Sequence, residues 1–427
     1  METIIVIGAG AAGLTVAYEL SKNNKNVIVL EAGERIGGRI YTLKDKFSVP
    51  VELGAEFIHG ELEHTLHFLK QAGIKYHPVK GQMFSLKHGK VSKENSGLHQ
   101  QWVELMKQMK NVKKDKPLSD LLQECFGDDK YKDLRESVTR FAEGFDLADI
   151  RKASTLSLYN EWCTEGSVQY RVDGGYQLLI DYLGAQCSKY KCDIYQNCCV
   201  KKINWREDEV NIITVNGRHF KGNKIVLTVP LGILQAEKNE QQYIEFVPGV
   251  DHYLSAAKNI GFGPVIKIIL EFNEPFWQKI NKNVGFVLTG EKMSTWWTQL
   301  PEQNCILTGW LGGRKALSFA DATSDEILEE SLKSLSSAFA VDLTSLKNKL
   351  RASEIINWKN VPNIAGGYSY DTVQSIAAKN ILNKPLQKTI YFAGEGLHEG
   401  ISLGTVEAAI ISGKNAALKI LHAGLAE

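Results

Sequence analysis

Residues 3–13 read TIIVIGAGAAG, an apolar run that passes without a break into a glycine-rich turn. A short run of this kind predicts a fully buried parallel strand over residues 3–7. Residues 14–20 repeat apolar side chains at helical spacing, and a second apolar run over residues 26–30 ends at Glu31. The stretch therefore predicts a strand–helix–strand unit with a G-x-G-x-x-G turn, and with it an α/β fold.

Each glycine of this turn has a physical task. Gly8 permits the tight turn, Gly10 lets the backbone approach a pyrophosphate, and Gly13 lets the helix pack closely on the strand. The start of the helix, which includes Ala12, presents backbone N–H groups to the phosphates. Glu31 follows at the distance where a carboxylate can accept both ribose hydroxyls, and it would repel a 2′-phosphate, which argues against NADP. A glycine turn in an ordinary α/β protein is the alternative, but strand, helix, second strand and acid all follow in order.

The residues after the second strand indicate which dinucleotide binds. Residues 31–39 read EAGERIGGR, so a glycine-rich loop with Ala32 and Gly38 ends in Arg39. A flexible loop that ends in a guanidinium suits a second anchor on the pyrophosphate. We therefore expect FAD, and the loop resembles the E-x-x-x-R-x-G-G-R stretch of two-dinucleotide-binding flavoproteins.

The C-terminal region predicts a second contribution to the same site. Residues 389–395 read TIYFAGE, a strand that leads to Gly394 and Glu395. After a short loop, Gly404, Thr405 and Val406 begin a helix that we expect to run to about residue 421. A helix start there would direct backbone N–H groups at a flavin carbonyl and stabilise the anionic reduced ring.

Taken together, these motifs resemble the flavin amine oxidase family, which includes monoamine oxidases, polyamine oxidases and L-amino acid oxidases. Intermediate stretches match in order: GGYQLL over residues 174–179, Val200 where a backbone contact to adenine is expected, and IVLTVPLG over residues 225–232. The resemblance implies a two-dinucleotide-binding, Rossmann-like FAD domain with an interleaved α+β substrate domain. The FAD domain would comprise residues 1–77, 173–252 and 355–427, and the substrate domain residues 78–172 and 253–354.

Lys267 is the first candidate catalytic residue. It lies in the apolar stretch VIKIILEF over residues 265–272, followed by Pro275-Phe276-Trp277. A lysine buried in such a strand is costly without a role, although an edge strand with a solvent-facing lysine is the alternative. The resemblance implies that Lys267 holds a water at flavin N5 and assists reoxidation by oxygen.

Tyr368, in the sequence GGYSY over residues 366–370, resembles the position where an aromatic ring stands over the substrate amine. The second aromatic residue of the monoamine oxidases corresponds to Thr405, so a full aromatic sandwich is not expected. Gly367 stands where monoamine oxidases carry the cysteine that bonds the flavin, so the FAD should be non-covalent. Trp358 resembles a tryptophan against the isoalloxazine, with an ordinary core tryptophan as the alternative.

Residues 54–60 read GAEFIHG and resemble the loop that passes the reactive face of the flavin, so Gly54, Ala55, Glu56 and Phe57 are expected to contact FAD. Glu56 is expected either to be a substrate carboxylate or to turn outward. His59 falls where animal polyamine oxidases have a histidine near the substrate amine, and the ordinary pKa of histidine suits binding or deprotonating an ammonium.

Three acids, Glu143, Asp146 and Asp149, lie close together in the predicted helical region. Plant-type polyamine oxidases place an acid in a similar stretch, where it would bind the distal ammonium of a polyamine. For any one of the three, a solvated helix end is the more ordinary interpretation.

Composition limits the remaining possibilities. The chain has 427 residues, 44% apolar and 23% charged, with a formal net charge of +1, so two domains are expected and a nucleic-acid partner is not. The seven cysteines form no Cys-x-x-Cys pair, which favours reduced thiols and argues against a metal site. No signal peptide and no apolar run of membrane-spanning length are recognised, so we expect a cytoplasmic protein.

The predicted activity is oxidation of a small amine, a polyamine or a monoamine, to an imine, with molecular oxygen as acceptor. An L-amino acid oxidase is the first alternative, but it needs an arginine for the substrate carboxylate, and residues 41–134 contain none. A non-redox FAD-binding protein is the second. Histone demethylation is not expected, because neither a long helical insertion nor an additional N-terminal domain is recognised. The oligomeric state is left open.

Overall fold

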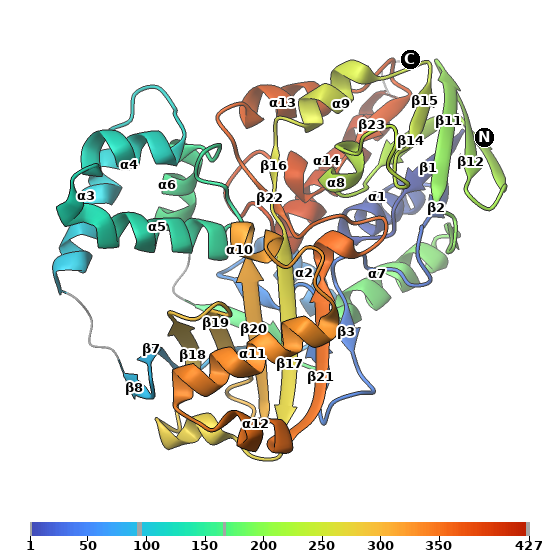
Figure 1. Cartoon of the computed structure of the whole chain (residues 1–427). Coiled ribbons are helices and arrows are strands. Elements are labelled where there is room, and N and C mark those ends of the chain that lie inside the picture. Colours follow the sequence, from blue (N-terminus) through green and yellow to red (C-terminus); the bar gives the residue numbers. More distant parts are fainter. Residues whose placement is uncertain (1, 92–95, 165–167, 424–427) are drawn as a thin grey trace.

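The computed structural model describes residues 2–91, 96–164 and 168–423 (Figure 1). Its first part is built on a five-stranded parallel sheet, as the first strand–helix–strand unit predicts. In spatial order the strands are β10 (Asp193–Tyr195), β2 (Asn26–Leu30), β1 (Thr3–Ile7), β14 (Lys224–Leu227) and β23 (Ile390–Phe392). Strands far apart in the sequence therefore share one sheet, and their carboxyl ends meet at one edge.

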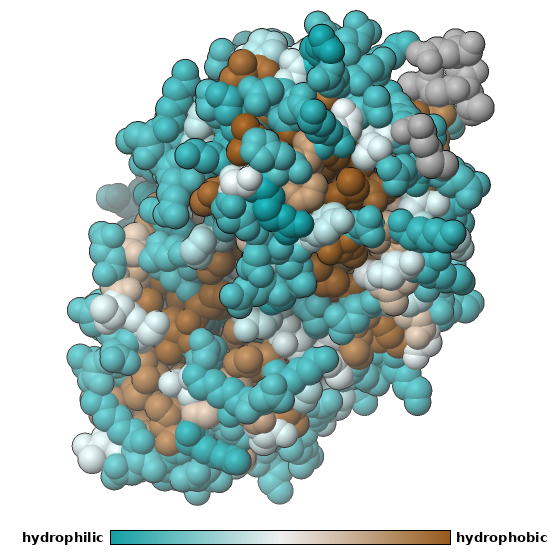
Figure 2. All heavy atoms as spheres, turned by 90° about the vertical axis from the view of Figure 1, so that its right-hand side faces the viewer, coloured by the Kyte–Doolittle hydropathy of each residue, from teal (hydrophilic) through white to brown (hydrophobic). Residues whose placement is uncertain are grey.

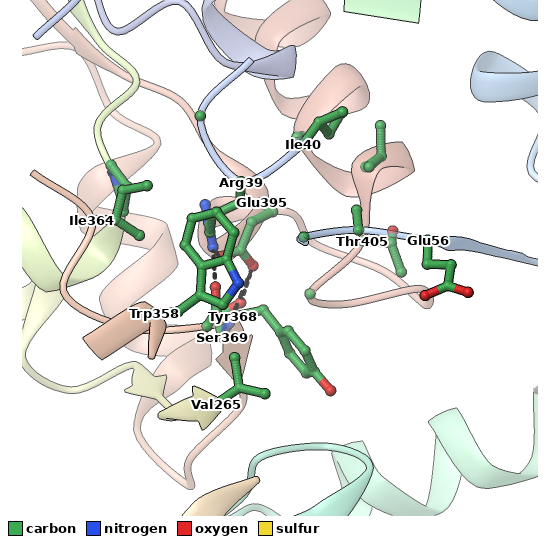
Figure 3. Close-up of a pocket in the computed structure, with 18 of the residues that line it drawn as sticks. Arg39, Ile40, Glu56, Val265, Trp358, Ile364, Tyr368, Ser369, Glu395 and Thr405 are labelled. Atoms are coloured by element: carbon green, nitrogen blue, oxygen red, sulfur yellow. Dashed lines mark hydrogen bonds and ion pairs between the residues drawn. The ribbon is translucent and has the colours of Figure 1, made fainter. Parts of the chain in front are cut away.

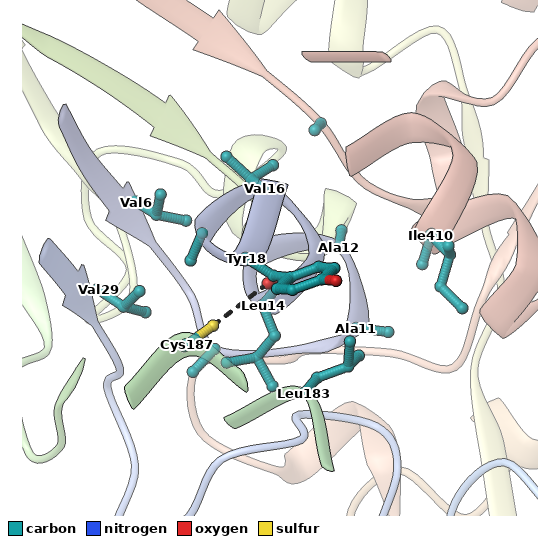
Figure 4. Packing of buried hydrophobic residues seen from close by; sticks show 14 of the residues in the cluster. Val6, Ala11, Ala12, Leu14, Val16, Tyr18, Val29, Leu183, Cys187 and Ile410 are labelled. Carbon is teal, nitrogen blue, oxygen red and sulfur yellow. Dashed lines mark hydrogen bonds between the residues drawn. The ribbon is translucent and has the colours of Figure 1, made fainter. Parts of the chain in front are cut away.

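Alternating side chains of β1 bury both faces of this sheet. Ile4 and Val6 pack with helices α1 (Ala11–Lys22), α7 (Gln177–Lys189) and α14 (Val406–Ala423), and Figure 4 shows Val6 in this cluster. Ile5 and Ile7 pack on the opposite face, against a second sheet. That sheet has the order β13 (His219–Gly222), β12 (Glu209–Thr214), β11 (Val200–Arg206) and β15 (Glu245–Val247). A strand buried on both faces reads as a continuous apolar run, which explains the sequence pattern.

A close contact of glycines holds α1 on β1. Gly8 has φ of +105°, a conformation that favours glycine, and a Cβ at Gly13 would lie 1.9 Å from the Gly8 carbonyl oxygen. Helix α14 approaches α1 just as closely, since a Cβ at Gly413 would lie 2.5 Å from the carbonyl oxygen of Ala12. The two helices that begin at the dinucleotide site therefore pack backbone to backbone.

The second part is built on a seven-stranded mixed sheet. Its order is β21 (Leu350–Asn357), β17 (Val265–Phe272), β20 (Ile306–Gly312), β19 (Thr295–Thr298), β18 (Val284–Thr289), β7 (Gln82–Lys87) and β8 (Lys90–Val91). Helix α11 (Ser324–Phe339) crosses one face (Figure 1) and packs on Ile266, Ile268 and Leu270. The alternate residues of β17, Lys267 among them, consequently face away from α11.

Four helices form a separate cluster: α3 (Ser96–Lys110), α4 (Leu118–Phe126), α5 (Lys132–Gly144) and α6 (Thr155–Thr164). A small third sheet has the order β5 (Phe57–His59), β9 (Gln169–Val172) and β6 (Tyr76–Pro78). The remaining elements are short: α2 (Glu63–Ala72), β3 (Thr42–Leu43), β4 (Val51–Glu52), α8 (Leu231–Leu234), α9 (Asp251–Ala257), β16 (Gly261–Phe262), α10 (Gly313–Leu317), α12 (Leu343–Lys349), β22 (Ser369–Tyr370), α13 (Ser375–Leu382) and four single 3-10 turns.

The predicted α/β fold is confirmed, whereas the predicted domain boundaries stay a proposal. The five-stranded sheet draws only on the segments proposed for the FAD domain, and most of the seven-stranded sheet draws on those proposed for the substrate domain. The boundaries after residues 77, 252 and 354 fall inside β6, α9 and β21. We therefore propose the same division with these boundaries moved to the ends of those elements.

Polar side chains cover most of the face in Figure 2, with apolar side chains visible between them. Within the described ranges, no helix combines the length and the apolar character that crossing a bilayer requires.

The Gly13 contact predicts a strong effect of adding one methyl group. Gly13→Ala should reduce the free energy of unfolding by about 1–3 kcal/mol or more, because the helix must move away from the turn. Urea unfolding at a fixed FAD concentration measures this. Gly290→Ala is the matched control, since a Cβ there has no neighbour within 4 Å. Equal stability of the two variants would contradict the packing argument.

Candidate functional site

A single large cavity, about 1390 Å³ in volume, extends from the carboxyl edge of the parallel sheet to the face of β17 that carries Lys267. Every residue predicted for the site lines it except Gly13. Gly13 lies beneath the turn and packs on Gly8, so it supports the cofactor site without facing it. The predicted residues that line the cavity are Gly8, Gly10, Ala12, Glu31, Ala32, Gly38, Arg39, Gly54, Ala55, Glu56, Phe57, His59, Val200, Lys267, Trp358, Tyr368, Gly394, Glu395, Gly404, Thr405 and Val406.

One end of the cavity suits a nucleotide. Helix α1 begins after Gly10 with no side-chain cap and no acidic residue in its first turn, so its N–H groups face the cavity for an anion. The Glu31 carboxylate accepts hydrogen bonds from the backbone N–H groups of Ala9 (2.8 Å) and Gly33 (2.9 Å). These bonds fix its oxygens at the end of β2, where the ribose hydroxyls are expected.

The middle of the cavity suits a pyrophosphate and a ribityl chain. A Cβ at Gly10 would approach only the carbonyl oxygen of Gly37, at 4.0 Å, and a Cβ at Gly394 would have no neighbour within 4 Å. The backbone is therefore bare on the side that faces the cavity, as a closely bound cofactor requires. The residues present fit FAD.

An ion pair joins the glycine-rich loop to the C-terminal motif. Arg39 Nη1 donates to Glu395 Oε1 (2.7 Å) and to the carbonyl oxygen of Gly367 (2.8 Å). Glu395 also accepts from the hydroxyl of Ser369. Figure 3 shows this pair beside Tyr368, whose ring points away from it into the open part of the cavity. Both neighbours of Tyr368 in the sequence are thus fixed by one ion pair.

The opposite end of the cavity holds a buried cluster of charges. Lys267 is 1% exposed on a strand between β21 and β20, so the alternative of an edge strand is wrong. Its amine donates to Glu56 Oε2 (2.6 Å) and to the carbonyl oxygen of Gly54 (3.0 Å). Burial alone would raise the pKa of Glu56, but the charges of Lys267 and Arg171 hold it below its usual value. Glu56 therefore does not turn outward but lines the cavity as part of a buried ion cluster, and its contact with a substrate stays a prediction.

Aromatic side chains form the walls around this end. The Tyr368 ring stacks on Trp310 with centroids 6.2 Å apart and an interplanar angle of 25°, and Trp310 meets Trp297 at 6.0 Å. The Tyr368 hydroxyl donates to the carbonyl oxygen of Phe145. Thr405 offers no aromatic ring. The ring that stacks on Tyr368 is that of Trp310, on β20.

Trp358 and Gly367 line the part of the cavity where the flavin ring is expected. The Trp358 indole N–H donates to the carbonyl oxygen of Leu53 (2.9 Å), and the side chain is 3% exposed. A Cβ at Gly367 would lie 2.6 Å from Leu147 and 2.7 Å from Val265, so no larger residue fits there. The wall at Gly367 offers no side chain for a covalent bond.

The sequence argument about His59 changes in the structure. Burial lowers the pKa of His59 to about 4, so the imidazole is neutral at neutral pH. It packs edge-on against Phe145 at 5.8 Å. A neutral imidazole can accept a hydrogen bond from an ammonium, but it is a weak base, so the expectation of an ordinary pKa was wrong.

The three acids of the helical region separate. Asp146 lines the cavity and accepts a hydrogen bond from the Trp162 indole (2.9 Å). Glu143 pairs with Arg314, and Asp149 with Arg151, so neither lines the cavity. Sequence spacing alone does not distinguish these roles.

Several lining residues lie outside every motif used in the sequence analysis. Arg140 on α5 lines the cavity near the four-helix cluster, and Trp297 donates its indole N–H to Glu56 (2.9 Å). Arg171 donates to the same carboxylate (2.7 Å). No motif marks these positions, because the contacts of Arg171 and Trp297 are with a carboxylate far away in the sequence. Among the described residues, no cluster of His, Cys, Asp or Glu suitable for a metal is found.

Comparison with known proteins adds an independent finding. A family model described as flavin containing amine oxidoreductase matches residues 11–421. Lysine-specific histone demethylase 1 homolog 3 of Arabidopsis thaliana is 25% identical, over 98% of this chain and 30% of the relative. Polyamine oxidase 4 of Oryza sativa subsp. japonica is 28% identical, over 97% of this chain and 88% of the relative.

The chain spans between 30% and 53% of the length of the first three histone demethylase relatives. Among solved structures, cyclohexylamine oxidase from Brevibacterium oxydans superimposes with a TM-score of 0.80 at 20% identity, and each chain is covered completely. This likeness establishes the fold.

Glu31 provides the first test of the nucleotide end. Glu31→Ala should weaken FAD binding by roughly tenfold to a hundredfold, because a charged acceptor is lost and two backbone N–H groups lose their partner. Fluorescence titration of flavin-free protein measures this. Glu207→Ala, which removes an exposed carboxylate that does not line the cavity, is the control and should bind normally. Unchanged affinity in Glu31→Ala would refute the assignment.

Proposed function

The chain belongs to the family of flavin-containing amine oxidoreductases, with FAD held non-covalently as its cofactor, and we propose that it oxidises a small amine, a polyamine or a monoamine, with oxygen as acceptor. The observation that carries the proposal is the buried Lys267–Glu56 pair, which faces an aromatic-walled cavity continuous with the dinucleotide site. The cytoplasmic location stays a prediction.

When bound, FAD would supply the redox chemistry: two electrons and a hydrogen from the α-carbon of the amine would be transferred to the flavin, and oxygen would take up the two electrons with two protons to give hydrogen peroxide. Glu31, the start of α1 and the Arg39–Glu395 loop would hold it. The released imine is hydrolysed by water to an aldehyde or ketone.

The residues of the chain would orient the amine and set its protonation. Tyr368 and Trp310 form an apolar aromatic wall that excludes water, which favours the neutral amine needed for oxidation. The neutral imidazole of His59 lies on the same cavity and would accept a hydrogen bond from the amine nitrogen. We propose that Lys267, fixed by Glu56 and Gly54, holds a water near the flavin and assists reoxidation.

The two alternatives remain distinguishable. An L-amino acid oxidase needs an arginine for the carboxylate, and Arg140 on the cavity wall is the residue that would serve. Arg171 is committed to Glu56. A non-redox flavoprotein would have no use for a buried lysine that requires a carboxylate to compensate it.

The direct test is the visible spectrum of the purified protein under anaerobic conditions. Addition of pooled monoamines and polyamines should bleach the flavin band, and separate additions identify the substrate. Bleaching by L-amino acids alone would favour the first alternative, and bleaching by a methylated-lysine peptide alone would favour the activity named in the demethylase relatives. No bleaching by any of them would leave the non-redox interpretation.

Substitution of Asp146 should distinguish polyamine substrates from monoamine substrates. If its carboxylate binds a distal ammonium, Asp146→Asn should raise KM for a diamine or polyamine about tenfold and leave kcat and monoamine turnover nearly unchanged. Glu143→Gln is the matched control, because Glu143 pairs with Arg314 away from the cavity. Equal effects of Asp146→Asn on both substrate classes would exclude this role.

A further inference from the structure

Arg171 is a buried arginine that the proposed mechanism does not use. It lies on β9, is 8% exposed, and pairs across the strands with Phe57 of β5. Its Nε and Nη2 atoms both donate to Glu56 Oε1, at 3.1 and 2.7 Å. The guanidinium also lies over the Phe57 ring, 5.0 Å from the centroid. Two donors of one guanidinium that converge on the same oxygen restrict the position of the carboxylate.

The Glu56 carboxylate divides its oxygens between two cations. Oε1 accepts from Arg171 and from the Trp297 indole, whereas Oε2 accepts from Lys267. Two cationic side chains therefore share one buried anion. If Lys267 were the only partner, a change in its charge or position would leave Glu56 buried without compensation, at a cost of several kcal/mol. Arg171 removes that constraint, because it compensates Glu56 whether or not Lys267 does.

We propose that Arg171 is a positioning residue of this site: it holds and compensates Glu56, and thereby leaves the Lys267 amine able to act on the cavity. The inference rests on the proposed role of Lys267 in reoxidation.

Glu52 is the other buried carboxyl near this cluster, and burial raises its pKa to about 7; its oxygens accept from Thr42 (3.0 Å) and from the backbone N–H of Tyr176 (2.6 Å).

A double-mutant cycle on the holoenzyme tests the inference. Arg171→Gln, Lys267→Met and the double variant are reduced with dithionite and mixed with oxygen, and the rate of flavin reoxidation is followed. Dithionite makes the measurement independent of any amine, so failure of the proposed substrate and failure of this inference give different results. Arg171→Lys keeps the charge without the bidentate geometry, and it replaces Arg171→Gln in the cycle if that variant does not fold.

We expect Arg171→Gln to slow reoxidation between about tenfold and a hundredfold, the range typical of a misplaced catalytic group, and Arg171→Lys to recover part of the rate. The double variant should be no slower than Lys267→Met, because Arg171 acts through that amine. If the two fold-changes in the reoxidation rate multiply in the double variant, the residues act independently and the inference is overturned. Normal reoxidation by Arg171→Gln would also overturn it.

Two further readouts exclude a merely structural role. The absorption spectrum of oxidised flavin should change in Arg171→Gln, because the net charge of the buried cluster of Glu56, Lys267 and Arg171 changes. The low pKa of Glu56 adds stability above its unfolded pKa that is lost as pH falls through the folded pKa, so without Arg171 this stabilisation should be smaller and its loss should be complete at a higher pH. Arg206→Gln removes an exposed arginine paired with Glu209 and should match the wild type in every measurement. Loss of stability at all pH values with unchanged reoxidation would instead mean that Arg171 is only structural.

Discussion

The ion pair between Arg39 and Glu395 is the interaction on which the site depends. It joins two residues at opposite ends of the sequence, and both line the same cavity. The same guanidinium binds the Gly367 carbonyl, and the same carboxylate accepts from Ser369, so Tyr368 is fixed from both sides. The pair is largely removed from water, with Glu395 5% exposed, and breaking such a pair leaves an uncompensated buried charge. Cofactor loop and substrate wall are thus one connected structure.

The second constraint is the alternation of β17. The face that packs on α11 carries Ile266, Ile268 and Leu270, which leaves Lys267 no position except the opposite face. That face is also buried, so the positive charge of Lys267 needs a compensating anion, and the Glu56 carboxylate provides it. The strand is therefore apolar throughout on the face that packs on α11, whereas its other face carries Lys267 and Glu271 alongside Val265 and Ile269.

The residues that the sequence proposed for the dinucleotide meet at one cavity because their positions are set locally. Gly8, Gly10 and Glu31 lie within one strand–helix–strand unit, where spacing along the chain determines spacing in the fold. Sequence reasoning was less successful where a role depends on what packs nearby. The pKa of His59 is lowered by burial that no motif records, and of the three neighbouring acids only Asp146 reaches the cavity. The stacking of Trp310 on Tyr368 likewise joins residues of separate segments, and no motif marks it.

The sequence by itself determined the parallel sheet, the dinucleotide site, the family resemblance and the buried strand that carries Lys267, because each is encoded in a short, periodic stretch. Only the tertiary structure decided which charges meet. Glu56, Arg171 and Lys267 come from three segments, and their contacts span 115 and 211 positions of the chain. The sequence does not show whether a carboxylate in a loop is solvated or buried between two cations. The electrostatic energy of the carboxylate is set by residues that are distant in the sequence but share its low-dielectric surroundings.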